Sequence, residues 1–350
     1  MIQPVGVGKF LLEAIEDRIE EFYSMNGGQL VKKVELIGYD KMMSEKDDIT
    51  IILAKANMLI YFSNLFKENN ELSDVRYLAH ELLNNTFKLS KTMLGTLDML
   101  EENKYDLIMA NPPYYQSKVM RDEANKTGQY TLGGAGVEAM FLEWILKSLA
   151  YGGTANVVLP DGIFSNDSNK KLKEYILTNC YMESIISLPV NTFFNTPKKT
   201  YILTIRKKTE NEISNNIVQN YPVFTYICTS IGETLDTYRF DDENNNDLHE
   251  AVCKYNNYKN LKDKLNIQEP FKSYFDNDIK FKAIEIKEFS TDKSWIIENW
   301  WNEEEKIKIG LKKNKSVYSL EDFKAILSDT INCMQEFKEE LECLEEDIKM

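Results

Sequence analysis

The 350-residue sequence contains only two histidines and five cysteines, and this scarcity excludes several kinds of site. The histidines, His80 and His249, lie far apart in polar surroundings, so a serine–histidine–aspartate triad or a zinc site has little material. The cysteines, at positions 180, 228, 253, 333 and 343, form no Cys-x-x-Cys pair and no metal-ligand spacing. We therefore expect reduced cysteines, no metal and a cytoplasmic chain.

The sequence also lacks a run of about 18 uninterrupted apolar residues, which a membrane-spanning helix requires. Its first residues lack the basic-then-apolar pattern of a secretory signal. Hydrophobic residues make up 43% of the chain and aromatic residues 11%, which is too much for an intrinsically disordered protein. The length fits one large catalytic domain with an appendage, or two domains, and we expect no membrane partner.

An excess of basic residues is missing too, because the net charge is −14. Residues 1–208 carry 24 Lys+Arg against 26 Asp+Glu, whereas residues 209–350 carry 18 against 30, so the two balances are −2 and −12. The near-neutral first part can still present a locally basic cleft, but the acidic second part is a poor phosphate binder. The composition and the hydrophobic periodicity of the sequence also change after Lys208, where we expect a domain boundary.

Residues 9–208 alternate helix-period and strand-like segments, which predicts an α/β fold with a mostly parallel sheet. Only about a dozen residues separate the last two predicted strands, so that pair should be antiparallel. Helices are predicted over 9–25, 48–66, 137–150 and 168–179, helix and loop over 67–90, and strands over 34–39, 105–110, 154–159, 182–188 and 200–206.

Beyond Lys208, residues 209–318 predict a small mixed domain and residues 319–350 a C-terminal helix. Ser319 and Asp322 fit a capping box at its start. Its seam is narrow and its last turns are acidic, which favours a basic partner helix over an identical copy; packing on residues 210–318 is the alternative. The seam follows a heptad spacing through Leu320, Phe323, Leu327, Thr330, Met334, Phe337, Leu341, Leu344 and Ile348.

The motif Asn111-Pro112-Pro113-Tyr114 directly follows the predicted strand 105–110. Two prolines force a rigid turn at the carboxyl end of the strand, where open α/β sheets bind ligands. The Asn111 side-chain oxygen and the Pro112 carbonyl are two fixed acceptors for an exocyclic amino group, and the aromatic ring can stack on its base. The plainer alternative is a turn that only ends a strand.

This motif resembles the signature of amino-group methyltransferases that use S-adenosylmethionine, chiefly the adenine-N6 DNA methylases. Segments 136–144, 149–164 and 187–196 narrow the resemblance to the modification (M) subunit of type I restriction-modification systems. The resemblance covers residues 1–208. It implies a Rossmann-like methyltransferase sheet with an antiparallel last hairpin, an α-rich C-terminal appendage, and site-specific methylation of an adenine flipped out of duplex DNA.

By the same resemblance, residues 3–10 form the cofactor loop, usually written Asp-Pro-x-x-Gly-x-Gly-x-Phe. A Walker phosphate loop is excluded because Phe10 follows Lys9 where Ser or Thr is needed. Asp40 matches the acid that binds ribose hydroxyls, with a solvated loop acid as the alternative. The implied residues are Asn111, Pro112, Pro113 and Tyr114 for catalysis; Gln3, Pro4, Gly6, Gly8, Phe10, Asp40, Asp98 and Asn111 for the cofactor; and Tyr114, Phe164 and Phe193 for the base.

Two departures from the family pattern leave other functions open. Gln3 stands where the family usually has Asp, and only Met1 and Ile2 precede it. We therefore expect that the family's first strand and its N-terminal helical domain are missing. The alternatives are an inactive, truncated scaffold of such a complex, or a methyltransferase for another amino or amide group, such as a protein glutamine or an RNA base.

No segment looks like a reader of DNA sequence, so specificity should come from a partner. The resemblance implies duplex DNA, a specificity (S) subunit bound through the C-terminal helix and, as a further partner, a restriction (R) subunit. Glu285-Ile-Lys287 imitates a nuclease carboxylate-x-lysine pair but is typical of a solvated strand. Trp295, Trp300 and Trp301 favour packing of the second domain over a base-stacking platform.

Overall fold

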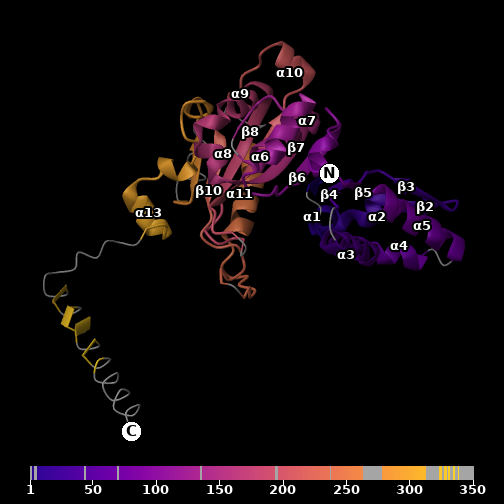
Figure 1. The fold of residues 1–350 in the computed structure, drawn as a ribbon, viewed down its shortest axis with the longest axis horizontal. Coiled ribbons are helices and arrows are strands. Elements are labelled where there is room, and N and C mark those ends of the chain that lie inside the picture. The colour runs from indigo at the N-terminus through magenta and orange to yellow at the C-terminus, as the bar shows by residue number, and fades with distance from the viewer. Residues whose placement is uncertain are drawn as a thin grey trace, which may run out of the picture. The chain divides into compact units, whose positions relative to one another are not determined.

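The computed structural model describes residues 2–3, 6–42, 45–68, 71–134, 136–193, 196–236, 238–262 and 278–312, and scattered positions from 323 to 338. It contains two compact units, Met1–Asn302 and Glu303–Met350. The first unit is built on a nine-stranded sheet with the order β11-β10-β8-β9-β7-β6-β1-β4-β5 (Figure 1). Its strands are β1 Ile2–Gln3, β4 Gly38–Lys41, β5 Phe87–Ser90, β6 Tyr105–Ala110, β7 Leu149–Pro160, β8 Cys180–Ser187, β9 Thr200–Lys207, β10 Val223–Ile227 and β11 Phe281–Ile284.

The sheet is mostly parallel, as predicted. β9 lies between β7 and β8 and runs antiparallel to both, which confirms the antiparallel pair predicted from the short connection. β11 is antiparallel to β10, and the remaining neighbours are parallel. The described helices are α1 Lys9–Glu13, α2 Ile19–Phe22, α3 Glu45–Tyr61, α4 Ser63–Glu68, α5 Leu72–Asn85, α6 Lys118–Thr127, α7 Val137–Ser148, α8 Asp161–Ser165, α9 Lys170–Asn179, α10 Glu210–Ser214, α11 Asp247–Lys262 and α13 Glu303–Ile309.

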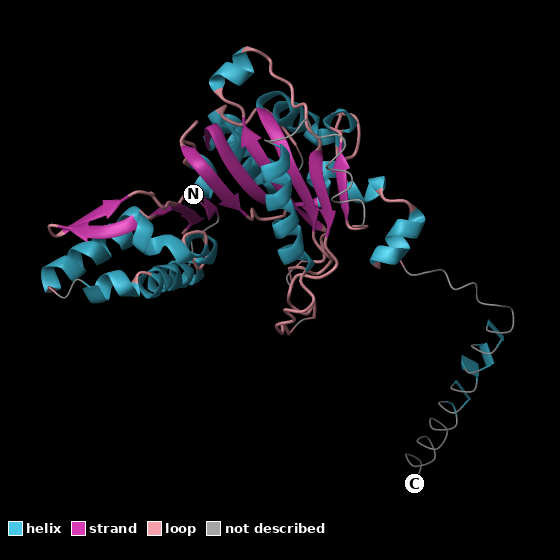
Figure 2. Cartoon of the chain, turned by 180° about the vertical axis from the view of Figure 1, so that it is seen from behind, coloured by secondary structure: helices cyan, strands magenta, loops and turns pink. Residues whose placement is uncertain are grey.

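Helices lie against both faces of the sheet (Figure 2). In α7, every residue except Lys147 is buried, because this helix packs directly against the central strands. Lys207, at the end of β9, donates to the carbonyls of Leu146 and Leu149, at 2.9 Å each, and so satisfies the end of α7. Burial lowers the pKa of this lysine.

The continuous helix predicted over residues 9–25 is wrong. The segment forms α1, a 3-10 turn at Glu16–Arg18 and α2, and then enters the hairpin of β2 Tyr23–Asn26 and β3 Gln29–Lys32. Gly27 and Gly28 form the two-residue turn with φ of 56° and 75°. Only glycine adopts two successive positive φ angles at low cost, so the chain reverses here instead of extending the helix.

The expectation that the first strand is missing is also wrong in part. Ile2 and Gln3 form β1, which pairs in parallel with β4 through Gly38 and with β6 through Met109 and Ala110. The predicted strand 34–39 begins only at Gly38, because the pairing with β1 and β5 starts there. The region predicted as helix and loop over 67–90 contains α5 and an additional strand, β5.

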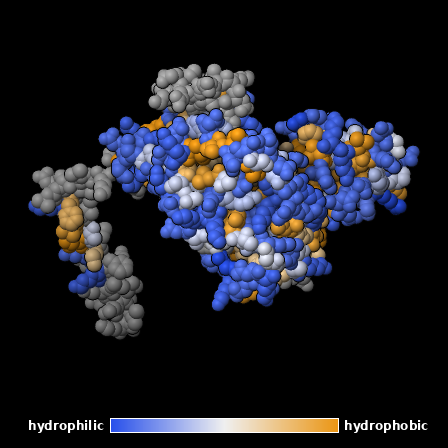
Figure 3. All heavy atoms as spheres, turned by 90° about the horizontal axis from the view of Figure 1, so that it is seen from above, coloured by the Kyte–Doolittle hydropathy of each residue, from blue (hydrophilic) through white to orange (hydrophobic). Residues whose placement is uncertain are grey.

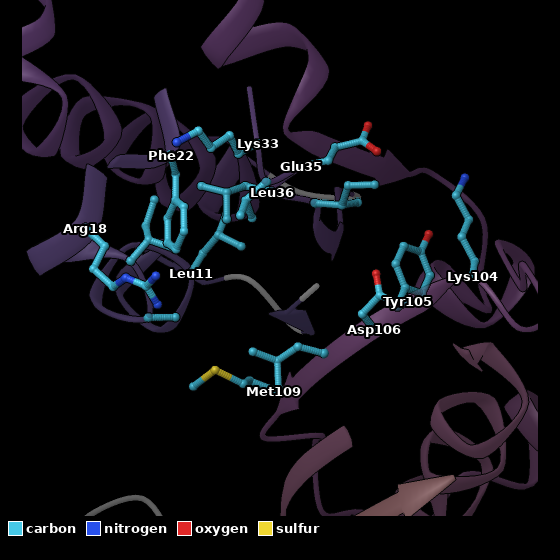
Figure 4. A pocket seen from close by; sticks show the side chains of 15 residues that line it. Leu11, Arg18, Phe22, Lys33, Glu35, Leu36, Lys104, Tyr105, Asp106 and Met109 are labelled. Atoms are coloured by element: carbon cyan, nitrogen blue, oxygen red, sulfur yellow. The ribbon is translucent and has the colours of Figure 1, made fainter. Parts of the chain in front are cut away.

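A groove of about 470 Å³ continues the line of β1 between residues 33–37 and β6. Figure 4 shows Leu11, Phe22 and Leu36 across this groove from Met109. On its β1 side, the described pairing of β6 is confined to its last two residues. Leu107 of β6 lines the groove and is 43% exposed, an unusual state for an apolar residue of a central strand.

The sheet continues across the boundary predicted after Lys208. β10 and β11 extend it beyond β8, and Glu298 accepts from Ser187 Oγ at 2.6 Å and Tyr201 Oη at 2.9 Å. Because these contacts tie residues 281–301 to β8 and β9, the first compact unit runs to Asn302. Trp295 and Trp301 are each 2% exposed, which confirms their interpretation as packing residues.

The viewed surface is largely hydrophilic, with apolar residues in separate patches (Figure 3). Helix α3 exposes Ile49, Ile52 and Ile60. In the described part of the chain, no helix has the length and apolarity needed to cross a membrane. Most of the predicted helix 319–350 lies outside the described residues, and among its seam residues Phe323, Leu327 and Met334 are described and exposed.

The open groove predicts different costs for truncating two neighbouring residues of β6. Ile108 is fully buried, so Ile108→Ala should lower the free energy of unfolding by about 2–5 kcal/mol. Leu107→Ala should cost less, about 1 kcal/mol, because 43% of this residue is already exposed to water. Urea denaturation of both variants measures the difference. Equal losses would mean that the groove is filled in solution.

Candidate active site

The loop that leaves β1 is shaped by two glycines. Gly6 has a φ of 51° and Gly8 a φ of 81°, conformations that other residues rarely adopt. A Cβ at Gly8 would lie 3.5 Å from the Ala54 Cβ, so the loop also runs close to α3. Asn57 of α3 donates to the Val7 carbonyl at 2.9 Å. The two glycines thus set the turns of the loop, and the hydrogen bond from Asn57 fixes its centre at Val7.

Asp40 lies at the carboxyl end of β4 and faces this loop. Its Oδ2 accepts from the Gly6 amide at 2.9 Å, and its Oδ1 accepts from its neighbour's amide, that of Lys41, at 2.8 Å. The half-buried carboxylate therefore orders the glycine loop directly. The prediction that Asp40 and the glycines belong to one site agrees with this contact, although the role of each toward a cofactor stays a prediction.

Asn111 follows β6 on the other side of β1. The Tyr114 hydroxyl donates to Asn111 Oδ1, and it lies 3.3 Å from the carbonyl oxygen of Val158 in β7. Burial, together with the charge of Glu138, raises the pKa of Tyr114, so the ring stays neutral. Asn111 Oδ1, the acceptor predicted for a target amine, thus already accepts from Tyr114, a contact that could not be predicted from the sequence.

Two neighbouring segments fix the backbone of the Asn111–Tyr114 turn. Lys198, in the loop between β8 and β9, donates to the Tyr114 carbonyl at 3.1 Å. The Val137 amide at the start of α7 donates to the Tyr115 carbonyl at 2.9 Å. Arg239 donates to the Thr192 carbonyl at 3.1 Å, so the β8–β9 loop is itself anchored. These lysine and arginine contacts were not predicted, because they join segments far apart in the sequence.

The remaining predicted residues are not all at this site. Phe164 is fully buried, with its ring 4.9 Å from that of Tyr201, so it has no free face for a base and the prediction is corrected. Phe193 is half-buried in the β8–β9 loop and stays a candidate. Asp98 is exposed and lines a shallow pocket beside Glu123 of α6.

Of the cofactor-loop residues, Gln3 forms β1, paired with Ala110. Phe10 is 40% exposed on α1, whereas Pro4 lies outside the described residues. In the turn after β6, Pro112 is buried and Pro113 half-buried. Both positions suit rigid backbone, which proline enforces.

Glu138 is a candidate site residue that was not predicted from the sequence. It lies in the first turn of α7, is 5% exposed, and its Oε2 has no hydrogen-bond partner among the described residues. Burial raises the pKa of its carboxyl, while backbone amides of Glu138 and Val137 and the charges of Lys198 and Arg121 oppose the rise. The available sequence signal was an acid among apolar residues, two positions after Gly136. This signal did not show that α7 begins at Val137.

The other chemistries raised by the sequence find no support. His80 and His249 are both exposed, and Cys180 and Cys228 are buried and free, with burial raising the pKa of each thiol to about 12. No metal-binding cluster of His, Cys, Asp or Glu occurs within the described ranges. Glu285 and Lys287 are exposed next to β11, as expected for a solvated edge.

The residues around β1 fit S-adenosylmethionine. Two positive-φ glycines let a ligand approach the backbone of the loop, and the carboxylate of Asp40 is an acceptor suited to ribose hydroxyls. Because β1 pairs with both β4 and β6, the loop leaves the sheet between Asp40 and Asn111. Cofactor and amine positions would therefore be adjacent.

The profile of the N-6 DNA methylase family matches residues 5–288. The chain therefore belongs to this family. It is 22% identical over 224 residues to the type I restriction enzyme MpnII methylase subunit of Mycoplasma pneumoniae, covering 61% of this chain and 39% of that protein. It is 21% identical over 301 residues to the MjaVIII methylase subunit of Methanocaldococcus jannaschii, covering 81% and 50%. The chain thus spans half or less of these two relatives.

Solved structures of similar proteins include the type I restriction enzyme EcoKI M protein, with a TM-score of 0.46, 20% identity, and coverage of 69% of this chain and 46% of that chain. A modification subunit of a type I restriction enzyme from Vibrio vulnificus gives a TM-score of 0.49 and 17% identity, with coverage of 73% and 48%.

The contact between Asp40 and Gly6 predicts a local effect of removing the carboxylate. In Asp40→Ala, the Gly6 amide loses its acceptor, so amide hydrogen exchange in residues 6–12 should become faster. Asp98→Ala, which removes an exposed acid, is the control and should leave this exchange unchanged. Mass spectrometry of peptides from the N-terminal region measures both. Unchanged exchange in Asp40→Ala would remove this carboxylate from the ordering of the loop.

Proposed function

We propose that the chain transfers a methyl group from S-adenosylmethionine to the N6 amino group of adenine in DNA, as the modification subunit of a restriction-modification complex. The observation that carries the proposal is the position of Asn111 and Pro112 at the carboxyl end of β6, next to the loop of β1 and across from Asp40. Membership of the N-6 DNA methylase family supports the same reaction.

A paired adenine cannot present its amino group to so recessed a turn, so the base must leave the duplex. The Asn111 Oδ1 and the Pro112 carbonyl would accept the two N6–H groups. The Tyr114 hydroxyl donates to Asn111 Oδ1, which has a second lone pair for the amine, and the Tyr114 ring would stack on the base.

When bound, S-adenosylmethionine would supply an electrophilic methyl group on a good leaving group. Gly6 and Gly8 would let it approach the loop backbone, and Asp40 would hold its ribose. Asn111 would orient the amine toward the methyl carbon. The chain would thus act mainly by positioning and by fixed dipoles, since little covalent chemistry is left to the protein.

We propose duplex DNA and a specificity subunit as partners, and a restriction subunit as a further one. A net charge of −14 disfavours phosphate binding by the chain itself, and no segment looks like a reader of DNA sequence. A partner should therefore supply the recognition of the target sequence. The heptad seam of residues 319–350 is the proposed contact with the specificity subunit. Exposure of Phe323, Leu327 and Met334 supports an apolar seam that a partner helix can cover.

A catalytically inactive scaffold is the second candidate, favoured by Gln3 in place of an acid. A scaffold would keep the partner helix without binding cofactor. A methyltransferase for another amino or amide group, such as a protein glutamine or an RNA base, shares the Asn111 geometry and differs only in its substrate.

The acceptor role of Asn111 predicts a separation of chemistry from cofactor binding. Asn111→Ala should abolish methyl transfer and leave the affinity for S-adenosylmethionine nearly unchanged, because the lost oxygen faces the target amine. The exposed Asn84→Ala on α5 is the matched control. N6-methyladenine is measured by mass spectrometry of plasmid DNA that lacks adenine methylation, incubated with the complex. Equal activity in Asn111→Ala would remove this residue from the mechanism.

The C-terminal seam predicts a defect in assembly alone. A variant lacking residues 319–350 should still bind S-adenosylmethionine but should no longer co-purify with a co-produced specificity subunit or methylate specific sites. Replacing Leu327 and Met334 by Glu should have the same effect, whereas Lys324→Glu and Lys338→Glu, outside the seam, should not. Retained complex formation after the deletion would show that the helix is dispensable for assembly.

A further inference from the structure

Helix α7 carries two buried glutamates that differ in their partners. Glu143, which is 1% exposed, accepts from the amides of Thr131 and Leu132 at 2.7 and 3.0 Å and pairs with Lys147 at 2.8 Å. Glu138 is 5% exposed, and its Oε2 has no partner among the described residues. Burying a carboxylate oxygen without a hydrogen-bond partner costs free energy. We therefore interpret Glu143 as a structural residue, whereas Glu138 keeps one oxygen, Oε2, available for another group.

The surroundings of Glu138 place it beside the Asn111–Tyr114 turn. The amide of the preceding residue, Val137, binds the Tyr115 carbonyl at 2.9 Å, so the start of α7 is fastened to the turn. Lys198, which donates to the Tyr114 carbonyl, is one of the two cations whose charges act on Glu138, and the charge of Glu138 acts in turn on Tyr114.

Gly136 leaves the space that this carboxylate occupies. A Cβ at position 136 would lie 2.3 Å from Glu138 Oε1 and 2.4 Å from Oε2. The residue has a φ of 85°, so the backbone favours glycine here. The carboxylate packs against this glycine and is buried, at the start of the helix that is hydrogen-bonded to the turn.

We propose that Glu138 accepts the proton that the target amine must lose when it is methylated. The inference rests on the proposed function and deepens it, since it assigns the fate of the proton at the same site. The lone pair of the amine nitrogen forms the bond to the methyl carbon, and the carbon–sulfur bond breaks with its electron pair going to sulfur. The methylated nitrogen then carries one proton in excess, which passes to the Glu138 carboxylate and from there to solvent.

Asn111 and Pro112 cannot take this proton, because an amide oxygen and a peptide carbonyl are hydrogen-bond acceptors but very weak bases. A carboxylate is a competent base, and a raised pKa brings it nearer to the pH at which general bases are most effective. The charged groups that act on Glu138 are Lys198 from the β8–β9 loop and Arg121 from α6; Tyr114 lies in the turn itself. Burial raises the pKa of the Glu138 carboxyl, and backbone amides of Glu138 and Val137 together with these two cations favour its ionised form and oppose that rise.

The test compares Glu138→Gln, which has the same shape but is not a base, with wild type in the assembled complex. Single-turnover methylation of unmethylated plasmid DNA is measured from pH 5 to 9. In wild type the rate should fall as pH drops through the pKa of Glu138. Glu138→Gln should lower the rate on the order of 10²–10⁴-fold and lose this acidic limb, since a general base contributes that factor. Glu138→Asp should restore part of the rate and the limb.

Exposed Glu102→Gln is the control and should behave as wild type. Binding of S-adenosylmethionine, and of DNA carrying a fluorescent adenine analogue, should be the same in Glu138→Gln and wild type. Carbon-13 NMR of glutamate carboxyls should show one group titrating above the ordinary range that is absent from Glu138→Gln. Thermal melting identifies loss of folding, and if Glu138→Gln does not fold, the limb in Glu138→Asp and the NMR titration decide.

An unchanged rate and pH profile in Glu138→Gln, with Asn111→Ala inactive, would overturn the role of Glu138 and leave the proposed function standing. Weakened DNA binding with an unchanged rate at saturation would also overturn it, because Glu138 would then only hold the base. A wild-type complex that binds cofactor and DNA but transfers no methyl group would overturn the proposed function and this inference together.

Discussion

The pairing of β1 with β4 on one side and β6 on the other is the interaction on which the candidate site depends. Parallel strands end at the same edge of a sheet, so Ile2 and Gln3 bring the glycine loop out between Asp40 and Asn111. A groove lies beside this strand, between residues 33–37 and β6, and Leu107 lines the groove and is exposed.

The sequence predicted the parts of the fold in which local pattern and packing agree. Strand 105–110 and the antiparallel pair of β8 and β9 follow from apolar runs and from a short connection. The prediction failed where tertiary pairing decides: Tyr23–Asn26 joins a hairpin because of the turn at Gly27 and Gly28, and β4 begins only where its partners begin. The sheet beyond Lys208 was missed because β10 and β11 are short and lie far apart in the chain.

In the candidate site, too, some residues could be predicted from local sequence patterns, whereas others depend on tertiary contacts. Asn111, Tyr114 and Asp40 could be chosen because motif and strand position coincide in the sequence. Phe164 could not be recognised as core, since its burial against Tyr201 depends on the neighbouring strand β9. Glu138 and Lys198 were missed for the reverse reason, because they reach the turn from elements whose positions no local pattern gives. The hydrogen bond from the Tyr114 hydroxyl to Asn111 Oδ1 is a further contact that the motif alone does not predict.

The proposed function requires that this site bind S-adenosylmethionine although Gln3 stands where the family usually has an acid. Calorimetric titration of the purified chain with S-adenosylmethionine tests it most directly, with Asp40→Ala titrated beside it. We expect saturable binding at one site per chain and clearly weaker binding in Asp40→Ala, because the variant loses both the proposed ribose acceptor and the hydrogen bond that orders the Gly6 loop. Absence of saturable heat in wild type, alone and in complex with a specificity subunit, would overturn the proposed function and favour the scaffold.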